Sequence, residues 1–95
     1  MKSTNQCQHQ KLQEIASLLE QINPDCGYGK WIAVLMVVFN ETHGSEEGFE
    51  LVDQWSSPGR TYRGTKDVWK YWSRFQLNHK KPLRMGTLIR LARGQ

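Results

Sequence analysis

The chain has 95 residues, among them four Trp, three Tyr and three Phe, and its formal net charge is +4. This length suits a single domain whose small core depends on large aromatic side chains. Two cysteines are too few for a disulfide framework, no signal peptide is recognisable, and the longest apolar run is about half of a membrane span. We therefore expect a cytoplasmic protein that makes no contact with a membrane.

The charge is divided unevenly along the sequence. Residues 1–57 hold three basic and eight acidic residues, a net charge of −5. The part from Arg60 onward holds ten basic residues and one acid, a net charge of +9. Basic residues gathered in one half of a chain favour a polyanionic partner over a small-molecule reaction.

The first half of the sequence predicts two helices. Apolar residues recur at helical spacing through residues 8–22, and Asn23-Pro24 ends the pattern because the residue before a proline is disfavoured in a helix. The apolar run of residues 31–39 fits a second helix, although its Val, Ile and Phe also suit a buried strand. We favour the helix because no second strand-like segment is present to pair with it.

The second half predicts three more short helices. Ser45 is expected to cap the third helix and Thr65 the fourth. The last helix covers residues 88–93. The apolar face of the fourth helix is expected to consist of Val68, Trp69, Trp72 and Phe75.

These elements predict an all-α fold, a small bundle of about five short helices. Residues 1–7 are polar and are expected to form a flexible N-terminus. Residues 8–95 then form a single helical-bundle domain.

The fourth helix carries a basic stripe, because Lys66, Lys70 and Arg74 fall within about 80° of one another on a helix. Such a stripe gains affinity for phosphates by releasing counterions, but an ordinary solvated helix face has the same pattern. The residues expected to contact phosphates are Arg60, Arg63, Lys66, Lys70, Arg74, Lys80, Lys81 and Arg84. Tyr62 and Tyr71 are candidates for stacking on unpaired bases. Tyr62 serves equally well as an anchor for the linker that carries it.

No catalytic or metal-binding pattern is recognisable. The soft ligands Cys7, His9, Cys26, His43 and His79 lack the spacing of a zinc site. No nucleophile has an identifiable base and orienting acid, and no glycine-rich phosphate loop is present. We therefore expect no metal, no cofactor and no catalytic residue, and a chain that is not an enzyme by itself.

A spaced series of segments resembles a known family. The series consists of Trp31 to Met36, Gly48 to Ser56, Tyr62, Trp69, Gly86-Thr87-Leu88 and Leu91-Ala92-Arg93. It is similar to the second type of primase C-terminal domain, a small helical module in replication proteins of phages, plasmids and other mobile elements. The resemblance covers about residues 12–93, nearly the whole chain.

The resemblance implies an accessory role beside a primase catalytic domain or a replicative helicase. The leading hypothesis is a non-catalytic module that binds single-stranded DNA template, with or without a nucleotide. The alternative is a protein-interaction module that links primase and helicase without appreciable DNA affinity. A third hypothesis, a small mobile-element protein that interferes with a host nucleic-acid machine, has no motif behind it. Ser56, which follows a core Trp, is expected to be a hydrogen-bonding residue at a helix end and not a nucleophile.

Overall fold

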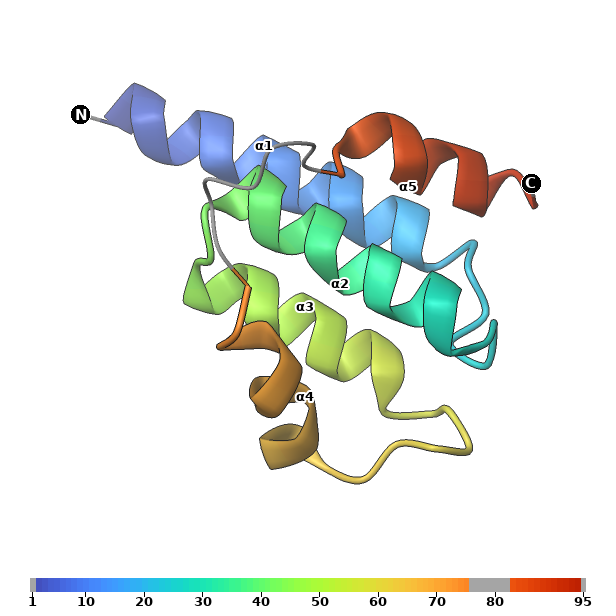
Figure 1. The fold of residues 1–95 in the computed structure, drawn as a ribbon. Helices are drawn as coiled ribbons and strands as arrows, with labels where there is room; N and C mark the ends of the chain where they lie inside the picture. Colours follow the sequence, from blue (N-terminus) through green and yellow to red (C-terminus); the bar gives the residue numbers. More distant parts are fainter. Residues whose placement is uncertain (1, 76–82, 95) are drawn as a thin grey trace.

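A computed structural model describes the backbone of residues 2–75 and 83–94, and the side chains of residues 10–75 and 83–94. This part of the chain forms five helices and no strand, which confirms the predicted all-α bundle (Figure 1). The helices are α1 (Lys2–Leu19), α2 (Tyr28–Thr42), α3 (Glu46–Ser56), α4 (Thr65–Trp72) and α5 (Met85–Ala92). None of these helices combines the length and the apolarity that a membrane crossing requires.

The helix bounds differ from the predicted ones mainly at the two ends of the chain. α1 begins at Lys2, six residues before the predicted start, and ends at Leu19 instead of Ile22. α5 begins at Met85, three residues before the predicted start at Leu88. The apolar run of residues 31–39 is helical, as predicted, and forms most of α2. The division into a flexible end and a bundle domain stays a prediction.

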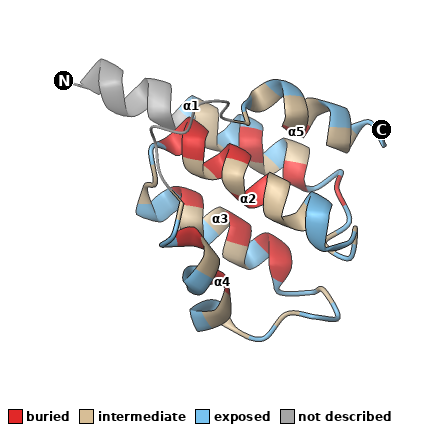
Figure 2. Cartoon of the chain, viewed as in Figure 1, coloured by how far each residue is buried: buried red, intermediate tan, exposed pale blue. Residues whose placement is uncertain are grey.

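α2 is the central helix and packs against all four others. Val34, Leu35, Val37 and Val38 of this helix have no exposed surface. Figure 2 shows buried residues, drawn red, on α2 and on the helices around it. A helix enclosed in this way needs apolar residues around most of its circumference, which explains the continuous apolar run in the sequence.

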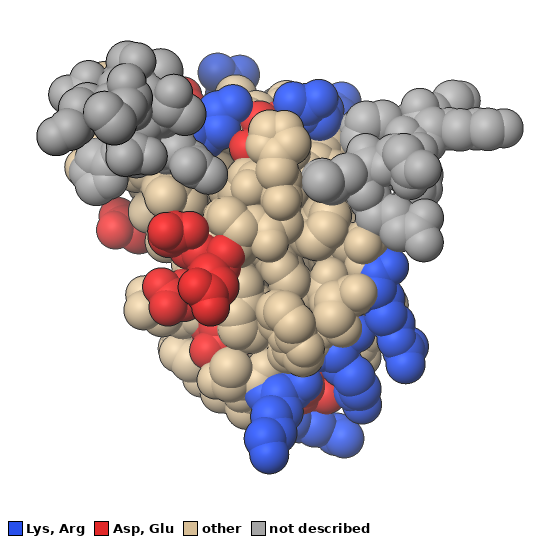
Figure 3. Space-filling model, turned by 90° about the vertical axis from the view of Figure 1, so that its left-hand side faces the viewer, with Lys and Arg blue, Asp and Glu red and all other residues tan. Residues whose placement is uncertain are grey.

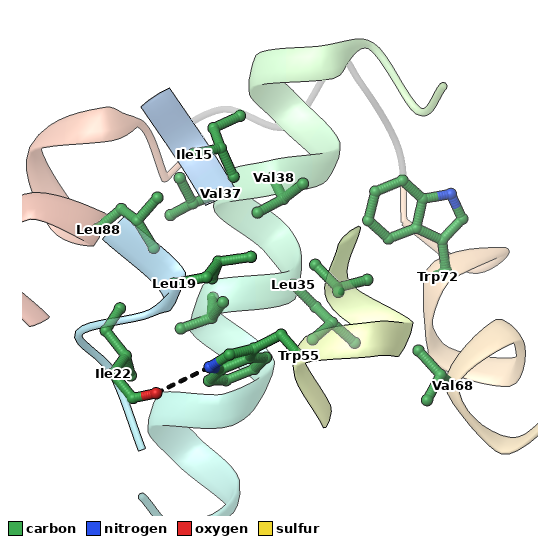
Figure 4. Packing of buried hydrophobic residues seen from close by; sticks show 12 residues of the cluster. Ile15, Leu19, Ile22, Leu35, Val37, Val38, Trp55, Val68, Trp72 and Leu88 are labelled. Atoms are coloured by element: carbon green, nitrogen blue, oxygen red, sulfur yellow. Dashed lines mark hydrogen bonds between the residues drawn. The ribbon is translucent and has the colours of Figure 1, made fainter. Parts of the chain in front are cut away.

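The core joins all five helices around α2 (Figure 4). Ile15 and Leu19 come from α1, Trp55 from α3 and Leu88 from α5. The indole Nε1 of Trp55 donates a hydrogen bond of 2.9 Å to the carbonyl oxygen of Ile22. Each buried aliphatic side chain contributes about 1.5–3 kcal/mol, so this cluster accounts for much of the stability of the fold.

The start of α3 is fixed by a cap and by a close helix contact. The Ser45 hydroxyl accepts a hydrogen bond of 3.1 Å from the Gly48 backbone N–H, which confirms the predicted N-cap. Gly48 lies against the Thr42 side chain, and a Cβ atom at this position would collide with it. Glycine is therefore required here so that α3 can approach the end of α2.

α4 differs from its prediction in three respects. It ends at Trp72, so Arg74 and Phe75, which the sequence placed on its two faces, follow the helix. Gly64 and not Thr65 occupies the N-cap position, with φ of 109°, and Thr65 is the first residue of the helix. Trp69 is 49% exposed, whereas Val68 and Trp72 are buried as predicted. Within residues 2–75 and 83–94, α4 packs only against α2 and α3, and Trp69 has one edge contact, with Phe49.

Candidate nucleic-acid interface

A cleft of about 490 Å³ opens between the first turn of α2, the linker before α4 and one face of α4. Its walls include three aromatic side chains, two cations and two carboxylates. These residues are Tyr28, Trp31, Tyr71, Arg63, Lys70, Asp25 and Asp67. The cleft therefore combines flat apolar surface with cations that could meet phosphates, the two features that single-strand binding sites use.

The three aromatic rings of the cleft lie against one another, Tyr71 edge to face with both others and Tyr28 tilted by 33° to Trp31. The Trp31 and Tyr71 ring centres are 5.2 Å apart with an interplanar angle of 86°. Tyr28 is 6.1 Å from Tyr71 and 6.3 Å from Trp31. Tyr28 is nevertheless 64% exposed, so most of its ring surface is open to a ligand. An edge-to-face contact covers one face of one ring of the pair and helps to hold both rings in position.

Trp31 is fixed from behind by the end of α3. Its indole Nε1 donates a hydrogen bond of 2.9 Å to the Ser56 hydroxyl, which is buried. This contact confirms the expected hydrogen-bonding role of Ser56. Trp31 is thus held as one wall of the cleft, and Tyr71 packs against it.

The linker between α3 and α4 is tied to the rest of the molecule at two places. The backbone N–H of Arg60 donates a hydrogen bond of 2.8 Å to the Asp25 carboxylate, which joins the linker to the turn before α2. Asp53 accepts hydrogen bonds of 2.9 Å from the Tyr62 hydroxyl and 2.8 Å from the Thr65 hydroxyl. The linker is therefore a fixed rim of the cleft.

These contacts decide between the two roles considered for Tyr62. Its ring is half-buried and its hydroxyl is bonded to Asp53, which confirms the anchor role. A stacking role for Tyr62 stays a prediction, and this geometry does not favour it. Tyr71, the other candidate, lines the cleft.

Four of the expected phosphate contacts lie on or next to α4. Arg63 and Lys70 line the cleft, and Lys66 and Arg74 are exposed beside it. The ammonium of Lys70 is 3.8 Å from an Asp67 oxygen, and its side chain is 64% exposed. An ion pair this long and this exposed contributes little and leaves the cation available.

The exposed face of α4 has an aromatic residue on each side of its basic stripe. At 100° per residue, Lys66 and Lys70 fall between Trp69 on one flank and Tyr71 on the other. Arg60 is also exposed and precedes the stripe. Figure 3 shows Lys and Arg side chains along the lower right edge of one face, with Asp and Glu side chains gathered at its left.

Arg84 has a different environment from the other expected phosphate contacts. Its Nε donates a hydrogen bond of 2.7 Å to a carboxylate oxygen of Glu41, at the end of α2. Lys11 donates to the other oxygen at 2.9 Å, and the Met85 backbone N–H donates at 3.1 Å. From Trp31 to Glu41 the axis of α2 rises about 15 Å, so Arg84 lies at the opposite end of this helix from the cleft.

Glu41 is the buried centre of this second group of charges, with 4% of its side chain exposed. Burial raises the pKa of its carboxyl, but the three hydrogen bonds outweigh burial and lower the pKa to about 2. The geometry gives Arg84 a role in holding α5 against α2. It does not join the single basic surface that the sequence suggested.

Some expectations lie outside the described residues. Lys80 and Lys81, the other two expected phosphate contacts, are among these, as are the side chains of Cys7, His9 and His79. Within the part of the chain that the structure describes, no three His, Cys, Asp or Glu side chains come together as a metal site would require. Burial raises the pKa of the Cys26 thiol.

The comparison with protein families identifies the family of the chain. The model of the family described as primase C terminal 2 matches residues 15–92. The chain belongs to this family. Its members are primase-associated C-terminal modules, and the resemblance found in the sequence is thereby confirmed. No curated protein and no solved structure matches the chain.

The structure explains several residues of the resembling segments in this primase C-terminal 2 domain. Gly48 permits the contact between α2 and α3, and Trp55 bonds to Ile22 in the turn after α1. Ser56 holds Trp31. These roles maintain the fold, and through Trp31 they also shape the cleft.

Sequence reasoning missed two residues of the cleft. Tyr28 lies between two glycines outside the predicted helices, and Trp31 was considered only as the first residue of the apolar run 31–39 and of the resembling series. The signal for Tyr28 was an aromatic residue in an otherwise small and polar turn. Nothing in the local pattern indicated that Tyr71, 43 positions later, packs against it.

Proposed function

We propose that this domain binds the single-stranded DNA template of a primase, through the cleft and the basic face of α4. The observation that carries the proposal is the juxtaposition of exposed aromatic surface with cations that have no buried counter-charge. Tyr28 and Tyr71 offer ring surface, and Arg63 and Lys70 stand beside them. Family membership supplies the association with a primase.

Stacking would supply the part of the affinity that distinguishes single strands from duplexes. A base in a duplex already has both faces stacked, whereas an unpaired base can lie against Tyr28 or Tyr71. Stacking on an aromatic side chain contributes about 1–3 kcal/mol per base and depends little on sequence. A module that accompanies priming on any template needs this tolerance of sequence.

Phosphate contacts would supply the rest. The described cations available for them are Arg60, Arg63, Lys66, Lys70 and Arg74, all of them exposed. Lys80 and Lys81 remain proposed phosphate contacts on sequence grounds. Arg84 is placed last among them because its guanidinium pairs with Glu41. A strand crossing α4 could place phosphates on Lys66 and Lys70 and bases on either flank.

We assign the domain an accessory role and no reaction of its own. Asp25 and Asp67 line the cleft, but Asp25 is bonded to the linker and Asp67 lies near Lys70. Among the described residues, no three His, Cys, Asp or Glu side chains come together as a site for the metal ions of polymerase chemistry would require. The primase catalytic domain or the replicative helicase would be the partner that acts on the bound strand.

The test is fluorescence anisotropy with a labelled DNA single strand at several salt concentrations. We expect affinity to fall with salt, with a log–log slope of about −2 to −4 for the contacts proposed. The variant Lys70→Glu/Arg74→Glu should bind about ten-fold more weakly or worse. Arg90→Glu/Arg93→Glu on α5 makes the same charge change on exposed residues away from the cleft, and serves as the matched control.

Three outcomes would contradict the proposal. These are no binding at low salt, an affinity indifferent to salt, and equal losses in the two double variants. Competition with unlabelled duplex of the same sequence adds a further check. A duplex that competes as well as the single strand would remove the role assigned to the aromatic cleft.

A further inference from the structure

The seam between α1 and α3 forms a second concave surface, remote from the cleft. Two hollows of about 300 Å³ and 210 Å³ adjoin there and share Ala16, Leu51 and Gln54. Leu12 extends their apolar floor at one end, and Trp55 does so at the other. We call this surface the acidic groove.

The rim of the acidic groove carries charge of one sign only. Glu20 stands on the α1 side, and Glu47 and Glu50 on the α3 side. No Lys or Arg lines either hollow. Among the described residues, none of these three carboxylates forms an ion pair, and all three are exposed. Lys11, the nearby cation of α1, is paired with Glu41.

The groove lies on a different side of the molecule from the basic face of α4. α1 contacts α2, α3 and α5, and α4 contacts only α2 and α3. α3 therefore stands between the acidic groove and α4 (Figure 1). A ligand in the groove would leave the cleft free.

We propose that the acidic groove docks an amphipathic helix of a partner protein, with Lys or Arg along both edges of its apolar stripe. The seam between two helices receives a third helix by the same packing that builds bundles. From Glu47 to Trp55 the floor is about 12 Å long, enough for apolar residues at i, i+3 or i+4, and i+7. The acidic rims on both sides select basic residues flanking that stripe.

The partner is a different protein and not a second copy of this chain. In the described part of the chain, every helix turns its apolar face into the core. The most exposed aromatic residue of α4 is Trp69. A second copy therefore has no described helix with a free apolar stripe to offer. The occupant must bring its own stripe.

The proposal does not depend on DNA binding and is tested separately. The probe is a synthetic helix of about 18 residues, with Leu at the stripe positions and Lys beside them, titrated into the isotope-labelled full chain and followed by NMR. We expect amide shifts at α1 residues 12–20 and α3 residues 47–55, and none at α4. A peptide of the same composition with shuffled order should produce no such shifts.

Two matched variants test the rim. Glu50→Lys should weaken binding of the probe about five-fold, because it replaces an attraction to the Lys side chains of the probe by a repulsion. Glu14→Lys makes the same change at an exposed site on the opposite flank of α1 and should weaken it less than about two-fold. Single-stranded DNA titrated into the same samples should shift the cleft residues equally in both variants, so that failure of either proposal is visible by itself.

Four results would overturn the docking proposal. The probe and the shuffled peptide could shift the same amides equally, or the probe could shift α4 instead. Glu50→Lys and Glu14→Lys could have equal effects. Concentration-dependent shifts at the groove without any peptide would assign it to a second copy of the chain.

Discussion

The two ends of α2 both gather basic side chains, but their surroundings differ. At the C-terminal end, Lys11 and Arg84 converge on Glu41, whose carboxylate is almost fully buried. At the N-terminal end, Arg63 and Lys70 line an open cleft beside the exposed ring of Tyr28. The nearest carboxylate there, Asp67, is partly exposed and 3.8 Å from Lys70.

The difference shows that the neighbouring carboxylate determines whether a cation holds helices together or stays available to a ligand. The buried carboxylate accepts three hydrogen bonds, and its two ion pairs hold α1 and α5 against α2. Exposed cations without such a partner keep their charge for a ligand. If this comparison is correct, substitutions at one end should change stability and those at the other end should change DNA affinity.

The largest effect is expected from Glu41→Gln, which removes the negative charge at the C-terminal end of α2. The unfolding free energy should fall by about 3 kcal/mol, because a buried ionic group loses its carboxylate while its partners stay. Urea denaturation followed by circular dichroism measures this change. Glu14→Gln, on an exposed part of α1, is the control and should change stability by less than about 0.5 kcal/mol. A small effect of Glu41→Gln would show that the ion pairs do not stabilise the fold.

The second effect is a loss of stability in acid that originates at Glu41. Its pKa in the folded protein is about 2, below the ordinary value of 4.5. A lowered pKa stabilises the folded state above the unfolded pKa, and this stabilisation is lost as the pH falls toward the folded pKa. Between pH 7 and pH 3 the loss should be about 2 kcal/mol.

Denaturation at a series of pH values measures this loss, with Glu41→Gln as the reference. The variant should lack this part of the pH dependence. Identical pH profiles for the two proteins would show that the Glu41 pKa is not lowered.

The third effect concerns the cleft at the N-terminal end of α2. Tyr28→Ala should weaken binding of a DNA single strand about ten-fold, because one exposed stacking surface is lost. Its stability should change little, since the side chain is 64% exposed. Tyr28→Phe keeps the ring and should bind like the unaltered protein. Anisotropy titrations compare the three proteins, and equal affinity of the Ala variant would exclude Tyr28 from the interface.

The smallest effect separates the two ends most directly. Arg84→Gln should lower the urea midpoint by less than Glu41→Gln does, because Lys11 and the Met85 N–H still bond to the carboxylate. Its DNA affinity should change less than about two-fold, in contrast to Lys70→Glu/Arg74→Glu. A loss of affinity as large as that of the double variant would return Arg84 to the DNA-binding surface.

Much of the secondary structure could be predicted because its causes are local. The spacing of apolar residues predicted α2 despite its strand-forming composition, and Ser45 was correctly expected to cap α3. Thr65 was misassigned because a threonine before a helical pattern resembles a cap, whereas its hydroxyl bonds to Asp53 on another helix. Trp69 fitted the apolar face of α4, but none of the described helices covers that flank.

The sequence by itself determined the all-α class, the uneven division of charge and the basic stripe of α4, because each depends on residue types and short spacings. Only the tertiary structure decided which cations pair with a buried carboxylate and which stay exposed to a ligand. Arg84 meets Glu41 across 43 positions, and Tyr71 meets Tyr28 across the same number. Contacts over such separations depend on how helices pack. The same basic half of the chain therefore contains both a structural ion pair and the open cations proposed to bind DNA.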